Sequence, residues 1–158
     1  MTKIINWKTK ETIIEDENLS MKELVEKAVE NGISLDYPDL SNANFSNANF
    51  ISGVRLFIAD FSGADFKGAN FTGANLQNAK FEGADLRGAN FTGALLIQSD
   101  FTGANFDGAN FGGACLSLSD LRSADLKGAN LRSADLKDIK ITEDQKDDLV
   151  KALGIKII

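Results

Sequence analysis

The sequence predicts an all-β solenoid, a fold in which short extended segments and turns wind the chain into stacked coils. One apolar residue, Phe or Leu, recurs at every fifth position from Leu35 to Leu136, with one extra residue between Phe50 and Leu56. The residues around it also recur: Ala two positions before, Asp or Asn one before, and Gly two after. A period of five matches neither a helix nor an alternating strand, so it indicates a repeat architecture.

Each five-residue unit is interpreted as a short extended piece followed by a turn. We call its central Phe or Leu position i. By strand alternation, positions i−2 and i point the same way and i−1 and i+1 point the other way. We therefore expect Ala and Phe or Leu to form the core, and Gly at i+2 to make the turn because it accepts a positive φ. Stacked coils would pair their backbones at about 4.8 Å.

The motif A-(D/N)-(L/F)-x-x, as in Ala64-Asp65-Phe66-Lys67-Gly68, resembles the pentapeptide-repeat family. The resemblance implies a right-handed quadrilateral β-helix with one pentapeptide per side, about twenty residues per coil and about five coils. Residues one coil apart should then share a character, and they do. One side is centred on Leu35, Leu56, Leu76, Leu96, Leu116 and Leu136, and another on Phe50, Phe71, Phe91 and Phe111. On the Phe side, the column Asn49, Asn70, Asn90, Asn110 and Asn130 predicts a ladder of amide hydrogen bonds.

The chain divides into three parts: 1–32, a hairpin and capping helix; 33–141, the β-helix; and 142–158, a second capping helix and a tail. Strands are expected at Lys3–Trp7 and Glu11–Ile14. Ser20 with Glu23 forms the first predicted capping box, and that helix should stop before Gly32. Thr142 with Gln145 forms the second, before a helix ending at Gly154. Both helices should cover open ends of the solenoid, which would otherwise expose apolar and unpaired groups.

Composition argues against enzymatic function. The chain has no His and one Cys, which excludes His-based nucleophile pairs, His metal ligands and an intrachain disulfide. The column Asp65, Asp85 and Asp125 is interpreted as a solvated face, and Cys115 as a space-filling residue. We expect no catalytic residues, cofactor or metal. The sequence shows no signal peptide or membrane-spanning run, so the expected location is cytoplasmic with no membrane association.

The side centred on Leu breaks the polar pattern of the outward positions. Its apolar outward residues, the candidate interface, are Tyr37, Phe57, Ile58, Leu95, Ile97, Cys115 and Leu118. A contiguous apolar patch usually marks a contact. Two interpretations stay open: the terminal segments fold over this side, or it is an interface. The second predicts a homodimer through the apolar side, with help from the C-terminal tail residues Ile155, Ile157 and Ile158.

The function that fits best is a non-catalytic interaction or scaffold protein with an unknown partner. The alternative, implied by the resemblance, is a DNA-mimicking regulator that binds a type II topoisomerase, DNA gyrase. A DNA mimic should concentrate negative charge along its rod, whereas residues 38–142 carry eleven Asp and Glu against nine Lys and Arg, a net of −2. The total net charge of −6 and pI near 4.7 argue against direct nucleic-acid binding.

Overall fold

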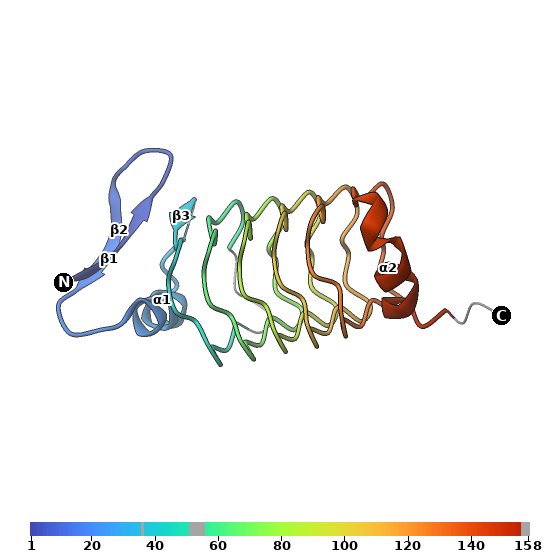
Figure 1. Ribbon diagram of the computed structural model, residues 1–158. Helices are drawn as coiled ribbons and strands as arrows, with labels where there is room; N and C mark the ends of the chain where they lie inside the picture. The colour runs from blue at the N-terminus through green and yellow to red at the C-terminus, as the bar shows by residue number, and fades with distance from the viewer. Residues whose placement is uncertain (36, 51–55, 156–158) are drawn as a thin grey trace.

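The computed structural model describes residues 1–35, 37–50 and 56–155, and shows a rod of stacked coils with a helix at each end (Figure 1). The extra residue predicted near 51–53, and tail residues Ile157 and Ile158, lie outside the described residues. Among the described residues, no helix is long and apolar enough to cross a membrane.

The coils are joined by single parallel β-bridges at position i−1, such as Asn70 to Asn90 and Asn90 to Asn110. Bridged residues lie twenty apart, or twenty-one across the 51–55 segment, as for Asn49 and Asn70. The twenty-residue coil is therefore confirmed. Each unit offers one bridging residue before the chain turns, so the rod is held by bridges with very few regular strands.

The core consists of the two predicted inward columns. Every described Phe or Leu centre from Leu35 to Leu131 is buried, and most of the Ala residues at i−2 are fully buried too. Phe rings one coil apart stack nearly parallel, with centroids 4.7 Å apart for Phe71 and Phe91 and 4.8 Å apart for Phe91 and Phe111. Ser99 and Ser119 replace Ala within the core, and each hydroxyl donates a hydrogen bond to a backbone carbonyl.

The Asn column forms an amide ladder only in part. Asn130 donates its side-chain amide to the Oδ1 of Asn110 at 2.8 Å. Along the rest of the column, the Oδ1 of Asn70 and of Asn90 instead accepts the backbone N–H two residues on. Asp and Asn on other sides do the same, so position i−1 supplies a local side-chain acceptor that closes the turn.

The N-terminal segment adds a hairpin to the first coil. Strands β1 (Thr2–Asn6) and β2 (Thr12–Asp16) pair antiparallel, and β1 also pairs with β3 (Pro38–Asp39). The strands differ by one or two residues from those predicted, because the Oδ1 of Asn6 accepts the N–H groups of Lys8 and Thr9. The chain therefore turns directly after Asn6, and Trp7 lies outside the strand.

Helices pack across both ends of the rod (Figure 1). Helix α1 (Met21–Glu30) has the Ser20 and Glu23 capping box, and its Leu24, Val25 and Ala28 are buried in the solenoid core. At the other end, the predicted second capping box is present. It starts a 3-10 turn (Glu143–Gln145) that leads into α2 (Lys146–Ala152). The side chain of Gln145 donates to the carbonyls of Leu121 and Ala124, so it satisfies backbone acceptors of the last coils.

Candidate functional site: the apolar side

The seven candidate residues lie along one side of the rod, in columns whose successive members are one coil apart. Phe57, Leu95 and Leu118 are exposed, with 44%, 40% and 49% of their surface accessible. The other four, Tyr37, Ile58, Ile97 and Cys115, are partly buried. These columns follow from the twenty-residue coil, since Leu95 and Cys115 form a β-bridge with each other.

The N-terminal segment covers one end of this side. Trp7 donates its ring N–H to the carbonyl of Ile58 at 2.9 Å, and its ring forms a T-shaped pair with that of Tyr37, with 5.6 Å between centroids. The ammonium of Lys80 lies 4.7 Å from the Trp7 ring centroid, and that of Lys8 lies 4.8 Å from that of Tyr37. The covered region is thus local to Tyr37 and Ile58, and Phe57, Leu95 and Leu118 stay exposed.

Two outward residues of this side give up the hydrogen bond that closes the turn. At Asn75, in the same column, Oδ1 accepts the backbone N–H of Gln77. Leu95 has no side-chain acceptor to offer the N–H of Ile97. Cys115 has only a thiol, which lies 3.3 Å from the hydroxyl of Ser117. A net contribution of about 1 kcal/mol is typical of such a bond, so each replacement sacrifices local stability.

Two further residues occupy a backbone conformation that disfavours them. Ile58 has φ 58° and Leu118 has φ 64°, both in the left-handed region. On the other three sides, this i+2 position is mostly glycine: Gly63, Gly68, Gly73, Gly83, Gly88, Gly93, Gly103, Gly108, Gly113 and Gly128. A side chain with a Cβ costs about 1–2 kcal/mol there, and a β-branched one such as Ile is an outlier. Strain of this kind concentrates at functional sites.

Several charged residues of the other sides are paired with one another. Arg87 donates to both carboxylate oxygens of Asp85 and, with Lys67, holds the pKa of that carboxyl well below its ordinary range. Arg122 likewise lowers the pKa of Asp120 by donating to its carboxylate. The Asp column singled out in the sequence is therefore neutralised by neighbouring cations at Asp85, as a solvated face would be.

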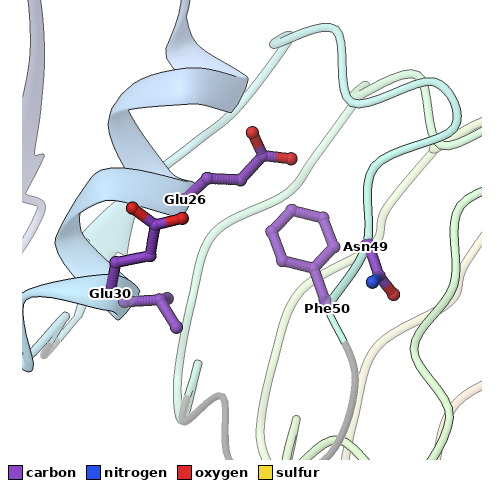
Figure 2. Close-up of a pocket in the computed structure, with 5 residues that line it drawn as sticks. Glu26, Glu30, Asn49 and Phe50 are labelled. Atoms are coloured by element: carbon purple, nitrogen blue, oxygen red, sulfur yellow. The ribbon is translucent and has the colours of Figure 1, made fainter.

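No metal or catalytic cluster emerges from the described residues. They contain no group of three or more Cys, Asp and Glu placed to hold an ion. A hollow of about 120 Å³ lies between α1 and the first coils and is lined by Glu26, Val29, Glu30, Asn49 and Phe50. Figure 2 shows Glu26 and Glu30 of α1 on one side and Asn49 and Phe50 on the other. The sequence did not indicate it, because only the packing of α1 brings these residues together. Two glutamates beside an apolar floor lack an evident nucleophile or acid–base partner.

Comparison with known proteins agrees with the geometry of the coils. The profile of the family described as pentapeptide repeats matches eight copies, over residues 52–93, 84–122 and 99–138. The chain belongs to the pentapeptide-repeat family. Comparison with the curated proteins gave no match.

Solved structures of pentapeptide-repeat proteins resemble this one. Rfr23 from the cyanobacterium Cyanothece 51142 is 26% identical, with a TM-score of 0.56 over 66% of this chain and 88% of its own. A thylakoid-lumen protein of Arabidopsis thaliana is 33% identical over 72% of this chain and 75% of its own, with a TM-score of 0.35. QnrB1, a plasmid-mediated fluoroquinolone resistance protein, is 21% identical over 76% of this chain and 86% of its own, with a TM-score of 0.29.

Proposed function

We propose that this pentapeptide-repeat protein is a non-catalytic interaction protein whose apolar side is the contact surface. The observation that carries the proposal is that four residues of this side depart from the pattern of most other units, on the side where Phe57, Leu95 and Leu118 are exposed. Leu95 and Cys115 omit the turn-closing acceptor, and Ile58 and Leu118 stand where glycine is favoured. Residues that cost stability and expose apolar surface have no folding benefit to explain them, whereas a contact explains both.

The charges of the rod favour this proposal over DNA mimicry. A DNA mimic presents unpaired negative charge to a topoisomerase, whereas Asp60, Asp85 and Asp120 each lie within 4.0 Å of a Lys or Arg ammonium or guanidinium. These ion pairs reduce the negative potential along their columns. An assay of DNA supercoiling by gyrase, at micromolar protein and low salt, tests the alternative: inhibition relieved by added salt would support mimicry.

A variant can remove the contact without weakening the fold. Leu95→Asn and Leu118→Asn copy Asn75 and Asn78, which stand in the same two columns one or two coils earlier. The first restores a turn-closing acceptor, and the second places Asn at a left-handed position that Asn tolerates, as Asn78 does at φ 58°. We therefore expect the double variant to fold with equal or higher thermal stability.

The experiment compares tagged wild-type protein with this double variant as bait in an extract of the source cells, alongside sedimentation of each purified protein. We expect wild-type protein to form a complex, with itself or another protein, that the double variant loses while its thermal midpoint is kept. Complexes retained in full by the folded double variant would show that the contact surface lies elsewhere.

A further inference from the structure

Two columns of the apolar side carry an apolar residue at one end and a charged residue at the other, at equal distances from the level of Leu95 and Ile97. Phe57 and Lys137 lie forty residues before and after Ile97 in the same i+1 column. Ile58 and Asp138 lie forty residues before and after Gln98 in the i+2 column. Because the coil is twenty residues long, each of these pairs stands two coils to either side of a shared middle level.

The two ends of this side carry opposite net charges, because Asp135 and Asp138 outnumber Lys137 at the C-terminal end. At the N-terminal end, the ammonium groups of Lys8 and Lys80 lie over the rings of Tyr37 and Trp7. At the C-terminal end, the carboxylates of Asp135 and Asp138 are exposed, and neither forms an ion pair with another described residue. Lys80 is shared with Asp60 at 3.6 Å, so the positive excess at the first end comes mainly from Lys8.

We propose that two copies of this chain pair through the apolar side in antiparallel orientation, about a two-fold axis that passes through the level of Leu95 and Ile97. This inference rests on the proposed function and names its partner. On the axis, Leu95 and Ile97 meet their own copies. At either end, the exposed ring of Phe57 receives the ammonium of the partner's Lys137, which has no ion-pair partner among the described residues.

The second end contact is electrostatic. The partner's Asp138 lies opposite Ile58, beside the ring of Trp7 and the ammonium of Lys80. An isologous interface repeats each contact twice, so one chain supplies both the aromatic end and the acidic end. Between the ends, Gln77 faces the partner's Ser117, a polar pair that can form hydrogen bonds.

Charge favours this orientation over a parallel one. A parallel two-fold axis, running along the rod, keeps each level of one copy opposite the same level of the other. The basic end would then meet the basic end, and the acidic end its own copy. The antiparallel axis instead sets the basic end against the acidic end, with Leu95 and Ile97 against their own copies at the middle level.

The first test is the mass of the purified full chain in solution, with Ile97→Asp as the disrupting variant. Ile97→Asp places two carboxylates against each other on the axis, so we expect at least a tenfold rise in the dimer dissociation constant. Thr72→Asp is the matched control, since it is also an i+1 position but on the Phe side. A monomer at high concentration, or a dimer unaffected by Ile97→Asp, would overturn the proposal.

The second test determines the orientation with variants that carry a single thiol each. A thiol crosslinker is chosen that spans the distance between packed sheets, about 10 Å. Cys115→Ser with Leu95→Cys puts the thiol on the axis, and we expect efficient covalent dimers. Native Cys115 lies one coil off the axis. It is therefore offset by two coils, about 10 Å along the rod, from its copy, and we expect several-fold less crosslinking. Equal crosslinking of both thiols would indicate a parallel dimer and contradict the antiparallel one.

The two proposals fail in different ways. If wild-type protein is monomeric but captures another protein that the Leu95→Asn and Leu118→Asn variant loses, self-association is wrong and the contact surface stands. If Ile155→Asp, rather than Ile97→Asp, dissociates a dimer, the C-terminal tail forms the interface and the proposed pairing is wrong. Loss of the β-sheet circular dichroism signal in Ile97→Asp is checked first, and Leu95→Asn provides a second disrupting variant.

Discussion

The Phe side and the apolar side share one interior but follow different rules outside. Phe71, Phe91 and Phe111 are as fully buried as Leu76, Leu96 and Leu116. On the outside, the Phe side keeps an Asn acceptor and a left-handed Gly in each of these units, whereas the apolar side departs from that pattern at Leu95, Cys115, Ile58 and Leu118. The solenoid is thus specified from within, which leaves its outer positions open to functional choice.

The fold tolerates these departures because its core is long and continuous. Two left-handed residues at about 1–2 kcal/mol each and two missing turn bonds at about 1 kcal/mol each total several kcal/mol. A domain stability of about 5–15 kcal/mol can absorb that. Other sides also contain departures, since Lys80 offers no acceptor and Ser123 and Ser133 have positive φ, but in the described repeats from residue 56 on, the apolar side alone exposes large apolar side chains.

The largest expected effect separates inside from outside on the Phe side. Phe71→Asp buries an unpaired charge between the stacked rings of Phe50 and Phe91, and should cost more than 4 kcal/mol and unfold the chain. Thr72→Asp adds its charge at an outward position, with an expected cost below about 1 kcal/mol. Circular dichroism during thermal unfolding measures both, and similar stability of the two variants would refute the inward and outward assignment.

The next largest effect is expected from a variant that places a left-handed Leu, as at Leu118, on the Phe side. Gly93→Leu introduces a side chain at φ 66°, at a position where an added Cβ meets no atom within 4 Å. The cost is therefore conformational rather than steric, about 1–2 kcal/mol. Urea denaturation should show that loss in the midpoint at an unchanged slope. An unchanged midpoint would mean that Leu118 is unstrained, and would remove one support of the proposed contact surface.

The reverse transfer gives a smaller effect of opposite sign. Leu95→Asn supplies an acceptor for the backbone N–H of Ile97, as Asn75 does for Gln77. In the monomer, we expect a gain of about 0.5–1 kcal/mol. The comparison is made in the Ile97→Asp background, where self-association cannot mask the gain. A loss of stability would show that Leu95 contributes to the monomer fold.

The repeat and its interior were predictable because they depend on a local rule applied many times. Period, coil length, core columns and both capping boxes all follow from spacings within twenty residues or fewer. The Asn ladder was mostly wrong because the Oδ1 of Asn70 and of Asn90 each accepts both the N–H and the hydroxyl of the Thr two residues on. Asn110 is followed by a glycine at that position, and its Oδ1 accepts the amide of Asn130. The contact of Trp7 with Ile58 spans fifty-one residues, and no periodic pattern encodes it.

The smallest effect tests the charged sides and should leave the apolar side untouched. The pKa of Asp120 is lowered from 3.8, first by the hydrogen bond from Arg122, so the ionised carboxyl stabilises the fold above pH 3.8 and that contribution is lost as pH falls below it. Arg122→Gln raises the Asp120 pKa towards 3.8 and should shift the acid-unfolding midpoint upward.

Lys127→Gln, which removes a cation without an ion-pair partner among the described residues, is the control. Leu95→Asn introduces no ionising group and is expected to raise overall stability, so it should shift the midpoint in the opposite direction, downward. An equal shift in all three variants would mean that acid unfolding reports overall stability rather than the Asp120 pair.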